Sequence, residues 1–208
     1  MEQLAYLLKH RVPGFFFLIE KVARWVVSVR FGSSIAAAES DSLVEGVIND
    51  SAAQMRALAI GDVSDLKNFL DDLPSSWLKY FSPHSFEINS LISIVESRAF
   101  LSYGLFVDGR LQGYALLKVA PTRSAFIGLL VHPDLSGLGL GKFIVGYLYW
   151  QASLAGLRTR STISKSNAAS LRSHRAVSDY DIVAELPNDY VMIEFPPEMR
   201  PRPELHIP

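Results

Sequence analysis

One stretch of the sequence decides the fold of this chain: Val131-His132-Pro133-Asp134-Leu135-Ser136-Gly137-Leu138-Gly139-Leu140-Gly141-Lys142. The apolar run before it, residues 124–131, suits a buried strand, and the apolar run after it, residues 143–154, suits a long helix. The three glycines let a ligand approach the backbone closely. The first N–H groups of a helix lack partners within the helix, so they can bind a phosphate. The stretch therefore predicts a strand, a turn and an anion-binding helix start.

The spacing of these glycines excludes the two most familiar phosphate-binding motifs. A P-loop needs a glycine, four residues, and then Gly-Lys-Ser/Thr. Here Ser136 occupies the position of the first glycine, and Phe143 replaces the hydroxyl that binds magnesium. A dinucleotide-binding motif needs a third glycine, but that position holds Ile144 or Lys142, depending on where the motif starts. The phosphate ligand is therefore of another kind.

The same stretch resembles the acetyl-CoA signature of the GNAT family of N-acetyltransferases. In that family Val-His-Pro-Asp leads into Gln/Arg-x-x-Gly-x-Gly/Ala at a helix start. Gly139 and Gly141 match the two motif glycines, and Ser136 stands in place of Gln/Arg. The resemblance implies that the preceding strand binds pantetheine through its backbone and that the turn binds the pyrophosphate of acetyl-CoA. The cofactor-binding residues so implied are Leu129, Leu130, Val131, Ser136, Gly137, Leu138, Gly139, Leu140, Gly141 and Lys142.

A second element of the family pattern lies further along the chain. Asn167 and Ser170 stand where the family has an Asn and a small residue at a helix start, and the resemblance implies that both contact the cofactor. His174 stands where the family has the Tyr that protonates the leaving sulfur. Imidazolium is a competent acid near neutral pH, so we predict His174 as the acid, with Tyr180 as the reserve candidate.

The general base is not evident from the pattern, because residues 124–131 contain no carboxylate where relatives often carry a glutamate. Asp134, His132 and His84 are candidates, and a water relay from a distant residue is an alternative. The acceptor is expected to be selected by the loops at 73–86 and 187–190. Four side chains of the first loop are candidates to line that side, or else belong to the core: Trp77, Tyr80, Phe81 and His84.

Length and composition bound these interpretations. The chain has 208 residues, of which 49% are hydrophobic, so it can bury one sizeable core. The net charge of -1 argues against a general nucleic-acid-binding surface. Between Asp134 and Asp179 there is no acidic residue, which suits a phosphate-rich cofactor. The chain lacks cysteine, and its five histidines show no close metal-ligand spacing, so we predict neither disulfides nor a metal site.

The first 50 residues differ from the rest. Residues 15–29 form a broad apolar arc at helical spacing, with Glu20, Lys21 and Arg24 on the other side, which predicts an amphipathic helix. These charges make the helix too polar to be predicted as a membrane span, and it lacks a signal-peptide cleavage pattern. We expect residues 1–31 to pack within the protein, with a peripheral membrane contact or a homodimer contact as alternatives. The expected location is cytoplasmic. Residues 36–50 read as a linker or a short helix.

From residue 54 the pattern is that of one α/β (α+β) domain with a GNAT-like acyltransferase fold, a mostly antiparallel twisted sheet flanked by helices. We expect an N-terminal extension over 1–50, the catalytic domain over 51–196 and an extended Pro-rich tail over 197–208. Asp108-Gly109 is a strong hairpin signal. The expected strands are 54–60, 100–107, 111–119, 122–131, 159–163, 180–184 and 190–195, and the expected helices are 61–70, 85–97, 143–154 and 167–177.

Three functions are compatible with these features. The first is an acetyl-CoA-dependent N-acetyltransferase that acts on a primary amine of a small metabolite, such as an amino sugar or an amino acid, by direct attack on the thioester. The second is a protein or peptide N-acetyltransferase. The third is a regulatory module that binds acyl-CoA without turnover, which the replacements at Ser136 and His174 would suit.

Overall fold

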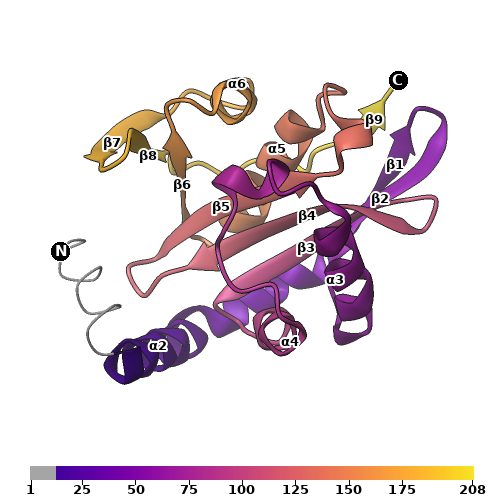
Figure 1. Cartoon of the computed structure of the whole chain (residues 1–208). Helices are drawn as coiled ribbons and strands as arrows, with labels where there is room; N and C mark the ends of the chain where they lie inside the picture. Colours follow the sequence, from indigo (N-terminus) through magenta and orange to yellow (C-terminus); the bar gives the residue numbers. More distant parts are fainter. Residues whose placement is uncertain (1–12) are drawn as a thin grey trace.

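A single nine-stranded sheet organises the chain. The computed structural model describes residues 13–208, with side chains described from residue 19 onward. The sheet has the strand order β7-β8-β6-β5-β4-β3-β2-β1-β9 (Figure 1). Its strands are β1 (Val44–Ile48), β2 (Ser51–Ala57), β3 (Phe100–Val107), β4 (Arg110–Val119), β5 (Ser124–Val131), β6 (Arg158–Ser164), β7 (Asp181–Leu186), β8 (Tyr190–Glu194) and β9 (Leu205–Ile207).

The predicted fold class is confirmed, since all strand pairs are antiparallel except β5 with β6 and β1 with β9. Strands β1 to β5 form a continuous meander. Helices α3 and α4 cover one face against β3 and β4, while α2 and α5 lie together on the other (Figure 1). The helices are α2 (Pro13–Ser40), α3 (Val63–Asp72), α4 (Ile88–Val95), α5 (Leu140–Leu154) and α6 (Ala168–Arg175), with short 3-10 turns η1 (Ile60–Asp62), η2 (Trp77–Tyr80) and η3 (Pro133–Leu135).

Helix α2 has two different halves. Its C-terminal half packs on the domain, with Val27, Ile35 and Ala38 buried. Its N-terminal half extends past the end of the sheet (Figure 1), and Trp25 there is 66% exposed. None of the helices described between residues 13 and 208 has the length and apolar character needed to cross a membrane.

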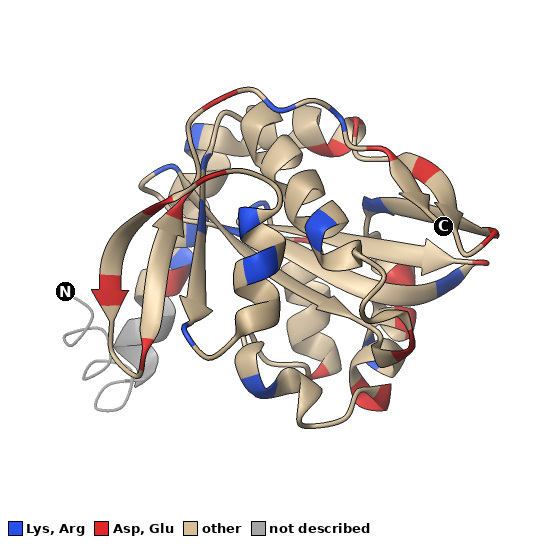
Figure 2. Ribbon diagram, turned by 90° about the horizontal axis from the view of Figure 1, so that it is seen from above, with Lys and Arg blue, Asp and Glu red and all other residues tan. Residues whose placement is uncertain are grey.

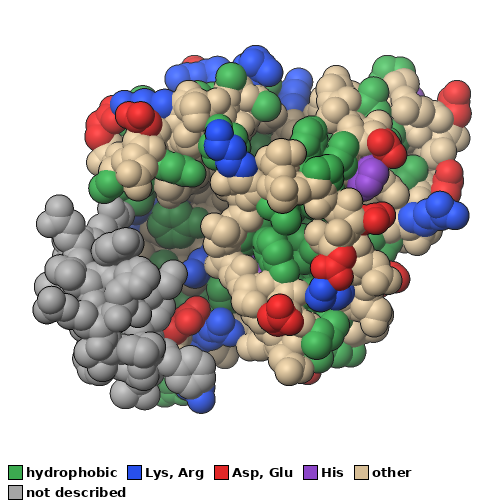
Figure 3. All heavy atoms as spheres, in the orientation of Figure 1, with side chains coloured by type: hydrophobic (Ala, Val, Ile, Leu, Met, Phe, Trp, Pro, Cys, Tyr) green, Lys and Arg blue, Asp and Glu red, His purple; other side chains and the backbone are tan. Residues whose placement is uncertain are grey.

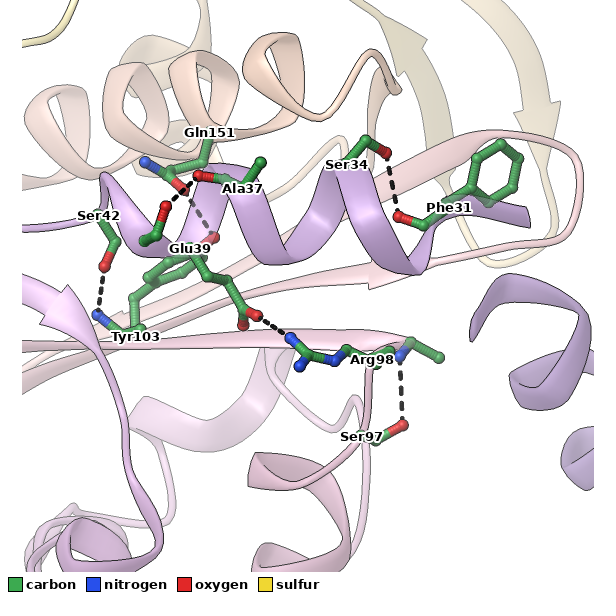
Figure 4. A network of polar contacts seen from close by, with 12 residues as sticks. Phe31, Ser34, Ala37, Glu39, Ser42, Ser97, Arg98, Tyr103 and Gln151 are labelled. Atoms are coloured by element: carbon green, nitrogen blue, oxygen red, sulfur yellow. Dashed lines mark hydrogen bonds and ion pairs between the residues drawn. The ribbon is translucent and has the colours of Figure 1, made fainter. Parts of the chain in front are cut away.

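A buried polar network fixes the end of α2 against α5 and the sheet (Figure 4). The hydroxyl of Tyr103 on β3 donates to Gln151 Oε1 on α5 at 3.1 Å, and both side chains are fully buried. Gln151 Nε2 in turn donates to the Asp41 carbonyl, and the Tyr147 hydroxyl donates to the Ser42 carbonyl. Because buried polar groups are costly unless paired, this network specifies where α2 ends and β1 begins.

Two strands lie in segments where the sequence predicts none. Residues 44–48, within the expected linker, form β1, and residues 205–207, within the expected tail, form β9 parallel to it. A Cβ on Gly46 would lie 1.7 Å from the Leu205 carbonyl oxygen, so the two backbones approach more closely than a side chain permits. Strands this short show little hydrophobic periodicity in the sequence. They form because β1 and β9, which are distant in the sequence, pair with each other.

Candidate functional site

The candidate site lies where β5 and β6 separate. The two strands pair only from Ser124 with Arg158 to Phe126 with Arg160. Beyond these residues β5 continues along β4, whereas β6 continues along β8. Figure 1 shows the two strands diverging toward their C-terminal ends. We call the region between residues 127–131 and residues 161–166 the splay. It leaves one edge of β5 without a partner strand.

The register of β5 decides which backbone groups face the splay. Ser124 C=O accepts from Ala120 N–H at one end, and His132 N–H donates to Gln112 C=O at the other. Antiparallel hydrogen bonding alternates along a strand, so even-numbered residues bond to β4 and odd-numbered ones face away from it. Leu129 and Val131 therefore direct their N–H and C=O groups into the splay. Leu130, which the resemblance also implied, directs its groups toward β4.

The glycine stretch forms the turn that the sequence predicted. Gly137 and Gly139 adopt φ of +81° and +86°, a region that side chains rarely enter, and a Cβ on either would meet no atom within 4 Å. Gly139 is the N-cap of α5 and caps it with no side chain. The hydrogen bonds of α5 begin with Lys142 N–H, so the preceding amides remain available to an anion.

Gly141 has a different reason to be glycine. A Cβ there would lie 2.6 Å from Ser173 Oγ on α6, so its absence lets α5 and α6 pack closely. This contact joins the turn to the second predicted element. Asn167 caps α6, and its Oδ1 accepts from Ser170 N–H at 3.1 Å. Figure 2 shows Lys and Arg on the helices in the middle of that view, and neither α5 nor α6 contains an acidic residue.

His174 lies inside the protein at 1% exposure. Its Nδ1 lies 2.8 Å from the Ser170 carbonyl, so this nitrogen carries the proton in the neutral ring. Nε2 is buried and has no hydrogen-bond partner among the described residues. The ring stacks on Phe195 at 5.9 Å between centroids. Burial lowers the pKa of His174 and outweighs the opposing effect of the Ser170 carbonyl. The ring is therefore neutral at neutral pH.

The other two predicted catalytic residues have different surroundings. Tyr180 meets the same Phe195 edge-on at 6.0 Å, and the Arg175 guanidinium lies 4.1 Å from the Tyr180 ring centre. Phe195 thus brings His174 and Tyr180 together. Asp134 lies on η3, where its side chain is 84% exposed and its Oδ2 is 3.5 Å from His132 Nδ1. Within residues 13–208, no three His, Cys, Asp or Glu side chains are grouped to hold a metal ion.

Trp77 and Tyr80 are candidates from the sequence for the acceptor side, and the sequence indicates no partner for either. In the structure, Trp77 Nε1 donates to the Val131 carbonyl at 2.7 Å, and the Tyr80 hydroxyl lies 3.0 Å from Ser166 Oγ. Both contacts join η2 to the splay. Aromatic residues in a loop were the only sequence signal, and that signal does not identify a partner.

Replacing His174 by phenylalanine is expected to flatten the pH dependence of stability. The pKa of His174 in the folded protein lies below its ordinary value of 6.5. Below pH 6.5 the unfolded chain therefore binds a proton that the folded protein does not, and the free energy of unfolding falls as the pH falls. Urea unfolding at pH 8.0 and pH 5.0 measures this slope. His84, whose pKa burial also lowers, is present in both proteins. Equal slopes in wild type and variant would contradict the prediction.

Comparison with known proteins gives the same family as the glycine stretch. The family model described as Acetyltransferase (GNAT) family matches residues 66–177, and no curated protein sequence matches the chain. The GNAT domain of S. lividans PAT superposes with a TM-score of 0.64 at 14% identity, covering 74% of this chain and 96% of that one. Mycobacterium smegmatis RimJ in complex with CoA-disulfide gives 0.60 at 16%, covering 74% and 87%.

A third similar structure is the ribosomal-protein-S18-alanine N-acetyltransferase from Escherichia coli, with a TM-score of 0.54 at 14% identity, covering 72% of this chain and 96% of that one. Identities this low establish a shared fold, while the family model, which spans more than half of the chain and includes the glycine turn, establishes membership. The chain belongs to the acetyltransferase (GNAT) family and is an N-acetyltransferase whose acyl donor is acetyl-CoA.

Proposed function

We propose that this enzyme acetylates a primary amine of a small metabolite, by direct attack of the amine on the thioester of acetyl-CoA. One observation carries the proposal: the unpaired edge of β5 leads, through residues 132–139, to a helix start whose amides are free. An extended ligand with amides at one end and a pyrophosphate at the other fits this pair of features. A small acceptor is favoured because the aromatic side chain of Phe81, which is 7% exposed, packs over Gly128 and occupies the space on that face of β5.

The residues around the splay fit acetyl-CoA. Leu129 offers its backbone N–H and C=O, and Val131 its N–H, to the pantetheine amides, as an added strand would use them. Residues 137–141 provide free amides and open space over two glycines for the pyrophosphate, and Lys142 adds a positive charge. Asn167 and Ser170 fix the start of α6 beside them. When bound, acetyl-CoA supplies the activated acyl group.

The leaving thiolate needs a proton, and we propose that Tyr180 supplies it while His174 orients Tyr180 through Phe195. A neutral, buried His174 is poorly suited to donate a proton near pH 7. A thiol with an ordinary pKa near 8.5 demands only modest acid catalysis, so Tyr180→Phe is expected to lower kcat about tenfold. His174→Phe is the matched comparison. The turnover rate of both variants is measured between pH 6 and pH 9. If His174→Phe changes this rate and Tyr180→Phe does not, His174 is the acid and Tyr180 is not.

The proposed reaction is tested by thiol release from acetyl-CoA across a panel of amino sugars, amino acids and peptides with free N-termini. Release with small amines alone supports the proposal. Release with peptides alone supports the alternative, a protein N-acetyltransferase, which the printed function of the Escherichia coli neighbour favours. Melting temperatures measured with acetyl-CoA and with longer acyl-CoAs report the acyl chain length. The absence of any shift would contradict the proposed donor site.

We also propose that the N-terminal half of α2 contacts a membrane surface from a cytoplasmic location. Four apolar side chains, three in this half and Val29 just beyond it, recur every three or four residues and are exposed: Ile19, Val22, Trp25 and Val29. Between residues 19 and 38, Lys21, Arg24 and Arg30 outnumber the single acid Glu20. Such a helix suits an anionic lipid interface. Trp25→Ala is expected to reduce sedimentation with vesicles containing phosphatidylglycerol. Negligible binding of the wild type, with a dimer in solution, would favour a subunit contact instead.

A further inference from the structure

The short turn η2 connects the two sides of the splay. Trp77 at its start reaches Val131, the last residue of β5, and Tyr80 at its end reaches Ser166, two residues beyond β6. The two contacts thus come from one turn of chain and end on β5 and just beyond β6, two strands that diverge from each other. In Figure 1, η2 lies in front of β5, on the face that carries α3 and α4.

The hydrogen bond from Trp77 occupies one backbone carbonyl on the unpaired edge of β5. The Val131 carbonyl points into the splay and accepts a hydrogen bond from the Trp77 indole N–H at 2.7 Å. A guest chain along β5 therefore finds the N–H and C=O of Leu129 and the N–H of Val131, but no further acceptor. Trp77 ends the available edge at this residue and so sets the register in which pantetheine can bind.

The hydrogen bond of Tyr80 connects η2 to the β6 side of the splay. Its hydroxyl lies 3.0 Å from Ser166 Oγ, which lies 2.8 Å from Ser164 Oγ at the end of β6. Ser166 immediately precedes Asn167, the N-cap of α6. The chain of three hydroxyls thus anchors η2 to both the end of β6 and the start of α6.

Hydrophobic burial does not account for these two positions. Trp77 and Tyr80 are 40% and 38% exposed, whereas their neighbour Phe81 is 7% exposed and packs against Gly128 on β5. Hydrophobic side chains gather in the middle of this face in Figure 3. Phe81 therefore anchors η2 by hydrophobic packing, whereas Trp77 and Tyr80 contact the two sides of the splay through their polar atoms.

We propose that Trp77 and Tyr80 form a brace that holds β5 at a fixed separation from the start of α6, so that the pantetheine part of acetyl-CoA meets a preformed channel. Both are positioning residues, and the inference rests on the proposed donor site. A channel of fixed width costs the ligand less ordering free energy than one that must assemble around it. The brace should therefore matter for pantetheine and not for the nucleotide end, which binds at residues 136–142.

Isothermal titration of the full chain with two ligands tests the brace. The ligands are CoA and 3′-phosphoadenosine 5′-diphosphate, which lacks pantetheine. Trp77→Phe and Tyr80→Phe each remove one polar contact and keep the ring, and Ser166→Ala cuts the Tyr80 contact from the other side. Each is expected to weaken CoA binding by about threefold to tenfold, with no change for the nucleotide. Trp25→Phe, on the exposed part of α2, is the matched control and should bind both ligands as the wild type does.

The possible outcomes separate the brace from the donor site. Unchanged CoA affinity in all three variants would overturn the brace and leave the donor site standing. An equal loss for both ligands, with a lowered melting temperature, would show general disruption and overturn it as well. If the wild type binds neither ligand, the proposed donor site fails, and the brace fails with it.

Discussion

Replacing Gly139 by valine is expected to weaken acetyl-CoA binding about a hundredfold. Gly139 holds φ of +86° at the start of α5, a conformation that costs a β-branched residue about 1–3 kcal/mol. We expect the chain to relieve this strain by moving the turn, which withdraws the amides that we propose as ligands of the pyrophosphate. Each charge-assisted hydrogen bond contributes about 1.5–3 kcal/mol, so losing one or two accounts for the expected factor. Titration with acetyl-CoA at fixed ionic strength measures it.

Gly109 is the matched control for this change. It lies in the β3–β4 hairpin with φ of +75°, and a Cβ there would also meet no atom within 4 Å. Gly109→Val should therefore lower the free energy of unfolding by a similar amount while leaving acetyl-CoA affinity unchanged. If Gly139→Val binds acetyl-CoA as tightly as Gly109→Val does, the turn is not the pyrophosphate site.

Replacing Gln151 by leucine is expected to lower the free energy of unfolding by about 2 kcal/mol. The substitution fills similar volume but removes the acceptor of the Tyr103 hydroxyl, which is fully buried. A buried donor without a partner costs about 1–3 kcal/mol. The Asp41 carbonyl loses a donor as well, at the junction between α2 and β1. Urea unfolding at pH 7 gives the change directly.

The double variant separates this loss from a packing effect. Tyr103→Phe alone leaves Gln151 without one partner, but Tyr103→Phe combined with Gln151→Leu removes both ends of the bond. Removing both partners is close to neutral when shape is preserved, so the double variant should recover about 1 kcal/mol relative to Gln151→Leu. Strictly additive losses would mean that Gln151 stabilises the protein by packing alone.

Local sequence was sufficient to predict much of the fold and the glycine turn between β5 and α5. The run from Val131 to Lys142 predicted a strand, a turn and a helix start, and all three are present because glycine spacing and helix termini act over a few residues. Asp108-Gly109 likewise predicted the β3–β4 hairpin. Asn167 and Ser170 were placed at a helix start and do form its cap.

Features that depend on distant segments could not be derived in this way. The use of Gly141 follows from a helix 32 residues away, since Ser173 occupies the space that a Cβ would need. The direction of the Leu130 backbone depends on its register with β4, and a shift by one residue would exchange it with Leu129. His174 was placed correctly on its helix, but its burial depends on Phe195, which follows the end of β8. Tertiary packing decides each of these.

Because β9 pairs with β1, one edge of β1 has no partner strand until residues 205–207 have been synthesised. Gly46 and Leu205 are neighbours in space although about 160 residues of chain separate them, and contacts of such long range form late. During synthesis β1 therefore presents a bare edge to other chains, with Val47 partly exposed even in the finished sheet. Nascent chains that stall before residue 205 should be especially prone to aggregate, and a chaperone that recognises extended apolar segments would find its target there.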